Sequence, residues 1–243
     1  MDSGFYAACA GLVAKTRALD GVAHNLANVS TTAFKGQRVD FQGLLAQSNL
    51  SGLSEVNQAI NSFGVASEPS LDLSQGSIER TGNPLDLAIE GRGFLAVKTS
   101  SGTAYTRNGH LQLSSKGELQ TSDGNPVLGD QGPVTLPPGT VSISPSGVIS
   151  VNGAIVTSLK LVEFDKQAPL QETSPGLYLS SSTPKAAVGS TVRQGALESA
   201  NVNPVESTVG LITIQREAEM LQRALSLFHG EMNRVATTDL ARV

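Results

Sequence analysis

Hydrophobic residues follow a helical spacing at both ends of the chain and a different spacing between them. In residues 3–28 one set of positions recurs every seven residues, and a second set recurs at the same interval between them. Such a heptad pattern predicts a helix with a narrow seam that packs on a partner helix. Gly11 and Gly21 weaken this helix by about 1 kcal/mol each relative to Ala, so it needs that partner. The predicted seam consists of Phe5, Cys9, Leu12, Thr16, Leu19, Ala23 and Leu26.

The last segment provides a partner helix. Its apolar positions alternate in steps of three and four, which is the most regular pattern in the chain. Pro204 suits a first helical turn, with Asn203 as N-cap and Glu206 close behind. Residues 204–236 and 3–28 would form rods of about 50 Å and about 39 Å, which we expect to pair as a coiled coil. The C-terminal seam consists of Leu211, Ile214, Ala218, Leu221, Leu225, Phe228, Met232 and Val235.

Three large apolar residues of the last segment, Ile212, Met220 and Leu227, lie off this seam. A helix pair surrounded only by water would not place apolar side chains there. They pack either against the body of the protein itself or against other subunits. We favour contact between subunits, because exposed apolar strips mark interaction sites.

Between the helices the period changes. Short runs rich in Val, Leu, Thr and Tyr alternate with turn dipeptides from Gly93 onward, which predicts an antiparallel meander of hairpins. A more continuously apolar strand is expected around residues 159–164. The predicted turns are at Ser101-Gly102, Asn108-Gly109, Lys116-Gly117, Asp123-Gly124, Ser146-Gly147 and Asn152-Gly153.

These patterns predict an α+β fold in which long N- and C-terminal helices pair around a central antiparallel β-rich domain. Residues 1–35 and 198–243 are assigned to the helical domain and residues 70–197 to the β-rich body. Residues 36–69, with Phe41, Leu44 and Leu45 and a tract rich in Ser and Asn, are assigned to a connector.

Composition narrows the function. The 243 residues carry a net charge of −4 and only 4% aromatic residues, which argues against a nucleic-acid binder and against docking to anionic lipid. The single Cys9 excludes a disulfide framework within the chain. The N-terminus has no basic, apolar leader pattern, and no stretch reaches the ~20 apolar residues that cross a bilayer.

No catalytic, cofactor-binding or metal-binding constellation is predicted. His24, His110 and His229 are scattered without metal-ligand spacing. The stretch GRGFLA from Gly91 matches the residue pattern of a dinucleotide-binding fingerprint. The residues after it predict a strand, however, whereas phosphate binding requires the N-terminus of a helix there. Asp86 and Glu90 are interpreted as a solvated edge. The chain is therefore expected not to be an enzyme.

Two polar segments flank the predicted helices. HNLANVSTTAFKGQR (His24–Arg38) lies at the end of the first helix, and ESANVNPVE (Glu198–Glu206) lies at the start of the last one. The first resembles the signature Asn-Asn-x-Ala-Asn-x-x-Thr-x-Gly-Phe-Lys of the bacterial flagellar rod and hook family, and the second resembles the matching C-terminal signature. RTGNPLDLAIEGRGFLAV (Arg80–Val97) and YTRNG (Tyr105–Gly109) are similar to signatures of the middle domain. The residues that match the terminal signatures are Asn25, Asn28, Thr31, Phe34, Lys35, Ser199, Asn201, Val202, Asn203 and Glu206.

Two positions depart from the family pattern. His24 stands where Asn is frequent, and Ala33 stands where Gly is usual. Gly tolerates a positive φ and Ala does so only at a cost, so the turn is expected to change at Ala33. From the residues themselves, we expect the amides of Asn25 and Asn28 to bind nearby backbone and cap the helix end, and Phe34 to anchor the following chain.

The resemblance implies a structural protein of the flagellar basal body that spans the periplasm. It implies export through the flagellar type III apparatus without a cleaved signal, and a helical tube with the terminal helices in the inner layer. The partners would be copies of the chain and other rod and hook proteins, with no nucleic acid and no membrane insertion. Met1-Asp2, the short chain, and Val127-Leu128-Gly129 followed by Gly132-Pro133 resemble the proximal-rod F-type more than the distal-rod G-type.

Three classes of function are weighed. A polymer subunit uses the two seams and the off-seam strip, and it is our interpretation. A distal-rod or hook-type subunit of the same family is the alternative. A β-hairpin binding or adhesion module would not need the strip, and an enzyme would need a pocket with convergent polar groups.

Overall fold

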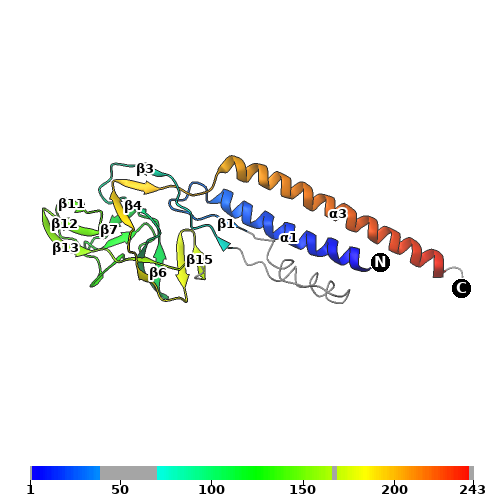
Figure 1. The fold of residues 1–243 in the computed structure, drawn as a ribbon, viewed down its shortest axis with the longest axis horizontal. Coiled ribbons are helices and arrows are strands. Elements are labelled where there is room, and N and C mark those ends of the chain that lie inside the picture. The colour runs from blue at the N-terminus through cyan, green and yellow to red at the C-terminus, as the bar shows by residue number, and fades with distance from the viewer. Residues whose placement is uncertain (1, 39–69, 166–168, 241–243) are drawn as a thin grey trace. The chain divides into compact units, whose positions relative to one another are not determined.

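The computed structural model describes residues 2–38, 70–165 and 169–240 (Figure 1). In the helices, the side chains of residues 2–7, 10, 228, 229 and 231–240 lie outside this description. The chain divides into two units, one with residues 1–27, 37–70 and 203–243, and one with residues 28–36 and 71–202. The α+β class with a β-rich core is confirmed. Residues 28–36 belong to the β-rich unit, although the sequence pattern grouped residues up to 35 with the helices.

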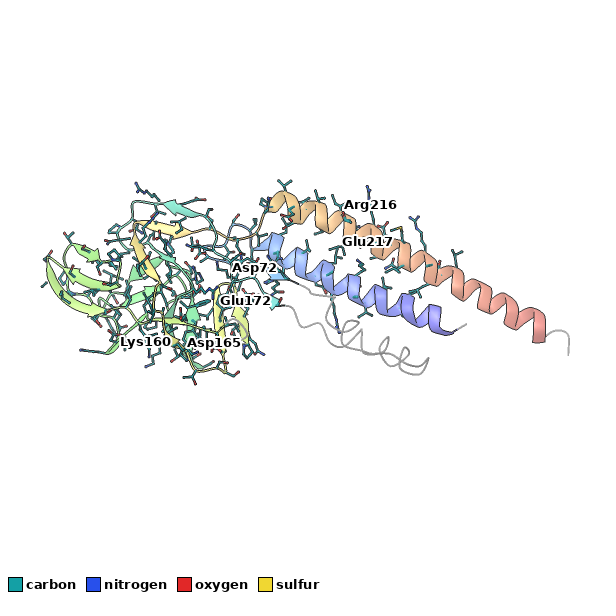
Figure 2. The ribbon with its side chains drawn as sticks, in the orientation of Figure 1. Asp72, Lys160, Asp165, Glu172, Arg216 and Glu217 are labelled. Carbon is teal, nitrogen blue, oxygen red and sulfur yellow. The ribbon has the colours of Figure 1, made fainter. Side chains whose placement is uncertain are left out.

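The first unit contains helix α1 (Asp2–Ala27) and helix α3 (Pro204–Leu240), which lie side by side and run in opposite directions (Figure 1). Lys15 Nζ is 2.6 Å from Glu217 Oε2, and the side chain of Leu221 lies over Gly11. Glu217 projects from α3 on the side of α1 (Figure 2). The unit also contains the two-stranded sheet of β1 (Gln37–Arg38) and β2 (Ser70–Leu71).

Helix α3 begins as its sequence predicts. Asn203 Oδ1 accepts hydrogen bonds from the backbone N–H groups of Val205 at 3.0 Å and Glu206 at 3.4 Å. Pro204, which has no N–H to satisfy, occupies the first helical position. The N-cap role of Asn203 is therefore confirmed.

The buried face of α1 differs from the predicted seam. Ala18 and Gly21 are buried, whereas the predicted seam residues Thr16 and Ala23 are exposed in the single chain. Thr16 instead donates its hydroxyl to the carbonyl of Leu12 at 2.9 Å. Gly11 and Lys15 contact α3, and neither of them is a predicted seam residue. Cys9, Leu12, Leu19 and Leu26 are half-buried, and the side chain of Phe5 lies outside the described residues.

On α3 the predicted seam is half-buried wherever its side chains are described, at Leu211, Ile214, Ala218, Leu221 and Leu225. The seam residues Phe228, Met232 and Val235 lie outside the described side chains. The strip residues Ile212, Met220 and Leu227 are exposed by 45%, 61% and 71%. Helix α3 thus has apolar residues both toward α1 and toward solvent.

The β-rich unit is built from short strands. The largest sheet has the order β15-β16-β6-β5-β14-β17, and all its pairs are antiparallel. Its strands are β5 (Phe94–Thr99), β6 (Gly102–Thr106), β14 (Leu161–Glu163), β15 (Leu170–Ser174), β16 (Leu177–Ser180) and β17 (Lys185–Ala186). A three-stranded sheet contains β11 (Val141–Ile143), β12 (Val148–Val151) and β13 (Ala154–Ser158).

Four antiparallel pairs complete this unit. They are β3 (Ile78–Arg80) with β19 (Ala196–Glu198), β4 (Leu87–Glu90) with β18 (Thr191–Gln194), β7 (Leu111–Leu113) with β8 (Leu119–Thr121), and β9 (Leu128–Gly129) with β10 (Gly132–Pro133). The pair β3–β19 brings the chain that follows residue 70 against the chain that precedes α3. The predicted meander of hairpins is therefore interrupted by pairings between distant segments.

Two cores lie on opposite faces of β5. Leu95 and Val97 belong to an aliphatic core, while Phe94 and Ala96 belong to an aromatic core. This division follows from the alternation of side chains along a strand. In the aromatic core Phe94 lies edge-on to Phe164 and Tyr178, with ring centroids 5.8 Å and 5.9 Å apart.

The turn dipeptides differ in their role. Asn152 and Gly153 both have positive φ, at +53° and +83°, as the two-residue hairpin between β12 and β13 requires. Asn108-Gly109 forms no hairpin. A Cβ at Gly109 would overlap the carbonyl of Leu87, so this Gly marks a close backbone approach.

Among the described residues, neither helix combines enough length with enough hydropathy to cross a membrane.

Candidate functional site

The N-terminal signature continues past α1 into the β-rich unit as a tight turn. The backbone N–H of Thr31 donates to the carbonyl of Asn28 at 3.0 Å, and the Thr31 hydroxyl lies 3.2 Å from Asn28 Oδ1. Ala33 has a φ of +56°, so it takes the left-handed conformation in spite of its side chain. Its N–H donates to the carbonyl of Glu198 at 2.7 Å. Phe34 is completely buried, as expected of an anchor.

A cluster of three buried charges lies directly behind this turn. Lys35 Nζ donates to Glu198 Oε1 at 2.7 Å, and Arg107 Nε donates to Glu198 Oε2 at 2.9 Å. The side chains of all three residues are at most 1% exposed. We call Lys35, Arg107 and Glu198 the ion triad. It joins the N-terminal signature, the YTRNG segment and the C-terminal signature at one point.

Backbone groups satisfy the remaining hydrogen-bonding capacity of the triad. The N–H of Gly76 donates to Glu198 Oε1 at 2.8 Å, and Lys35 Nζ also donates to the carbonyl of Ser74 at 2.7 Å. The Arg107 guanidinium donates to the carbonyls of Ile89, Gly91 and Gly93 at 2.9–3.0 Å. It also lies 5.7 Å from the centroid of the Phe94 ring. This planar pattern of donors suits Arg and does not suit Lys.

Burial sets the electrostatics of the triad. Loss of hydration lowers the pKa of Lys35 below its usual value, while the charge and hydrogen bond of Glu198 oppose this shift. Buried charges of this kind add little net stability, but removal of one partner leaves the others unpaired at high cost. The triad therefore fixes how the three segments meet.

Two Asn side chains of the signatures act like pieces of backbone. Asn201 Oδ1 accepts the N–H of Gly36 at 2.7 Å, and its Nδ2 donates to the carbonyl of Asp72 at 2.7 Å. Asn25 Oδ1 accepts the N–H of Gln37 at 2.7 Å, and its Nδ2 donates to the carbonyl of the same residue at 2.9 Å. The expected capping of the helix end by Asn25 is therefore replaced by a clamp on the chain that returns past the helix.

The other signature residues have separate roles. Ser199 Oγ donates to Glu79 Oε1 at 2.9 Å. Val202 is half-buried and Glu206 is exposed. The sequence reasoning did not select Arg107 and Glu198, although both lie in quoted signatures. The available signal was weak: Glu198 ends strand β19 and Arg107 follows directly on strand β6.

Within the described part of the chain, the polar side chains outside the ion triad are not arranged as a catalytic group. Asp86 was expected at a solvated edge, but it is buried, and its Oδ1 lies 3.0 Å from both Asn83 Nδ2 and His110 Nδ1. In the described ranges no three His, Cys, Asp or Glu side chains gather as metal ligands. The strand β5 follows directly on Gly93, as the sequence predicted.

Comparisons with known proteins agree with the signatures. The family described as the flagellar hook protein FlgE/F/G D1 domain matches residues 88–151, and the flagellar basal body rod FlgEFG protein C-terminal family matches residues 193–227. The chain is 32% identical over 225 residues to the flagellar basal-body rod protein FlgF of Mesorhizobium japonicum, with 90% of each chain covered. It is 32% identical over 250 residues to FlgF of Caulobacter vibrioides, with both chains covered completely.

A third FlgF, from Salmonella typhimurium, is 33% identical over 245 residues, covering 93% of this chain and 94% of the relative. The FlgG of Caulobacter vibrioides is 29% identical over 245 residues. These likenesses confirm the expected preference for the F-type over the G-type. The chain belongs to the family of flagellar basal-body rod proteins of the FlgF type.

Proposed function

We propose that this chain is a structural subunit of the rod of the flagellar basal body, and that α1 and α3 are the parts through which it assembles. The relatives named as basal-body rod proteins support the location and the structural role. The observation that carries the role of the helices is the distribution of apolar side chains on α3.

Helix α3 has two apolar faces. One consists of the half-buried seam residues, of which Leu221 lies over Gly11 of α1. The other, which we call the outer stripe, consists of exposed residues at helical spacing: Val205, Val209, Ile212, Met220 and Leu227. At about 100° per residue the two faces lie about 180° apart around the helix axis. A helix with apolar residues on opposite sides needs neighbours on both sides.

The outer stripe is large enough to drive association. Burial of an aliphatic or Met side chain contributes about 1.5–3 kcal/mol, so five such side chains offset a substantial part of the roughly 4–15 kcal/mol that association costs. We infer that neighbouring subunits cover the stripe. The pairing of α1 with α3 then extends into a coiled coil, and the helices form the inner layer of a tube with the β-rich unit outside them.

The ion triad holds together, within the β-rich unit, the two chain segments that lead to the helices. Lys35 follows α1 and Glu198 precedes α3 within a few residues, so the chain leaves both helices through the same buried cluster. Partners are copies of this chain and other axial proteins of the flagellum. The family resemblance supports export through the flagellar type III apparatus.

The test replaces two residues of the outer stripe in a strain that lacks the gene. Met220→Asp together with Leu227→Asp should remove the protein from purified basal bodies and abolish motility, since two charges would have to be buried between subunits. Gln215→Asp is the matched control, because Gln215 is exposed and lies on neither apolar face. Normal rods with the double variant would contradict the proposed role of the stripe. Intact, motile flagella in the deletion strain itself would contradict the rod function.

A further inference from the structure

The β-rich unit has a pocket of about 480 Å³ beside the ion triad. This volume is within the range of about 300–1,000 Å³ that is typical of binding pockets. Most of its wall is apolar, and its polar groups include two arginines. We call it the Arg92 pocket, and its main lining residues are Leu71, Leu73, Arg92, Phe94, Arg107 and Phe164.

Arg92 is held at this pocket by the backbone on either side of it. The carbonyls of Gly91 and Gly93 both accept from Arg107 Nη1 at 2.9 Å. The N–H of Gly91 donates to Gln75 Oε1 at 3.2 Å, and the N–H of Gly93 donates to Ser190 Oγ at 2.9 Å. Four hydrogen bonds thus fix the turn that presents Arg92, so its backbone loses little freedom when a partner binds.

The pocket has an unbalanced charge. Arg107 pairs with Glu198, which it shares with Lys35, whereas Arg92 is exposed and forms no ion pair within the described part of the chain. Among the described residues that line the pocket, none is Asp or Glu. A carboxylate can pair with the guanidinium in a bidentate manner, while an adjacent aliphatic side chain covers the wall formed by Leu71, Leu73 and the Phe residues. The Arg92 pocket therefore suits a ligand that carries a carboxylate next to an aliphatic group.

The chain itself presents such a pair at the first turn of α3. Val205 is 71% exposed and begins the outer stripe, and Glu206 beside it is exposed with no ion pair within the described residues. The N-cap bonds from Asn203 fix the backbone of both residues. We propose that the Arg92 pocket binds Val205 and Glu206 of a second copy of this chain. This inference rests on the proposed function as a rod subunit.

A charge exchange tests the pairing in the full-length protein, expressed in a strain that lacks the gene. Arg92→Glu and Glu206→Arg each place like charges together, so each should lower the amount of the protein in purified basal bodies at least about tenfold. The double variant restores opposite charges and should return to within about twofold of wild type. Lys98→Glu is the matched control, because Lys98 is exposed on β5 and does not line the pocket.

Cysteine cross-linking then identifies the partner. In a Cys9→Ala background, Arg92→Cys and Glu206→Cys variants are co-expressed on separate chains and oxidised in purified basal bodies. A disulfide-linked dimer that requires both variants supports contact between copies. A doubly substituted chain that forms only an internal bond would show that the contact lies within one chain, and the inference would be wrong.

The outcomes separate this inference from the proposed function. Wild-type incorporation of Arg92→Glu, or a double variant no better than the weaker single variant, overturns the pairing and leaves the rod function in place. If a single variant is missing from the basal bodies, the melting temperature of the purified variant is compared with that of wild type. If Arg92→Glu proves to be unfolded, Arg92→Gln takes its place. Intact flagella without the gene would overturn the rod function itself.

Discussion

The Lys35 ammonium lies 2.7 Å from the Glu198 carboxylate, although the two residues are 163 positions apart in the chain. Arg107, from the middle of the sequence, pairs with the other oxygen of the same carboxylate. Three segments that are far apart in the sequence therefore meet at a single buried anion. This arrangement makes Glu198 the residue of the triad whose loss should cost most.

Glu198→Gln should destabilise the protein by about 3–5 kcal/mol. The substitution keeps the shape of the side chain but removes the negative charge, so two buried cations remain without a counter-ion. Urea denaturation of the purified full-length protein, followed by a signal of the β-rich unit, measures the change in the free energy of unfolding.

Asp165→Asn is the control for this prediction. Asp165 pairs with Lys185 at 2.8 Å, but both side chains are largely exposed and screened by solvent, so loss of the pair should leave the free energy of unfolding nearly unchanged. Equal effects of Glu198→Gln and Asp165→Asn would show that burial of the triad does not determine its importance.

Ala33 tests the cost of the left-handed turn. Ala33→Gly should be nearly neutral, within about 1 kcal/mol, because relief of the φ of +56° is offset by the greater freedom of Gly in the unfolded chain and by the loss of a buried methyl group. Ala33→Val should destabilise by more than about 2 kcal/mol, since a β-branched residue at positive φ is strained and the site is closed. Thermal unfolding of both variants beside wild type checks the order. A stable Val variant would show that the turn can rearrange.

The buried face of α1 makes a further prediction. Ala18→Leu should weaken the contact between α1 and α3, because Ala18 is 7% exposed and lies on the same face as Gly11 and Lys15. Thr16→Leu adds the same bulk at an exposed position and should leave the contact intact. Amide hydrogen exchange over α1 in the monomer reports the difference. Equally fast exchange in both variants would support the seam predicted from the sequence, in which Thr16 faces α3.

The sequence could predict the helices, because each repeats one period over many residues. It could predict the hairpin at Asn152-Gly153 for a local reason, since both residues must adopt positive φ. It could not predict the centre of the α1 contact. Heptad counting selects large residues, whereas the structure places Gly11, which is not a seam position, under the side chain of Leu221.

The triad was beyond sequence reasoning for a different reason. Lys35, Arg107 and Glu198 are ordinary charged residues in separate segments. The pairing of β3 with β19 positions Glu198, the pairing of β5 with β6 positions the chain before Arg107, and the hydrogen bond from Ala33 N–H to the Glu198 carbonyl brings in Lys35. Neither pairing has a local signal strong enough to place three charges at one point. The signatures indicated which segments matter, and the structure shows the contact that joins them.

Tyr178 provides the pH-dependent prediction. Its side chain is completely buried, and among the described residues its hydroxyl is the one buried side-chain polar atom that forms no hydrogen bond within geometric limits. Burial raises the pKa of Tyr178 above the usual 10.0, the Glu172 carboxylate adds to the increase, and the nearby backbone of Lys35 opposes it. Because the pKa is higher in the folded protein, its contribution to stability is complete below about pH 10 and is lost as the pH rises further.

Tyr178→Phe removes both the unpaired hydroxyl and its titration. At pH 7 the variant should be as stable as wild type or more stable by about 1 kcal/mol, because no buried hydroxyl remains unsatisfied. Above pH 10 wild type should lose about 1.4 kcal/mol per pH unit more than the variant, since the unfolded Tyr ionises while the folded one does not. Urea denaturation at pH 7, 10 and 11 measures both effects. If the free energies of unfolding of wild type and variant changed in parallel with pH, Tyr178 would ionise equally well in the folded protein. A large loss of stability of the variant at pH 7 would show that the Tyr178 hydroxyl has a hydrogen-bond partner.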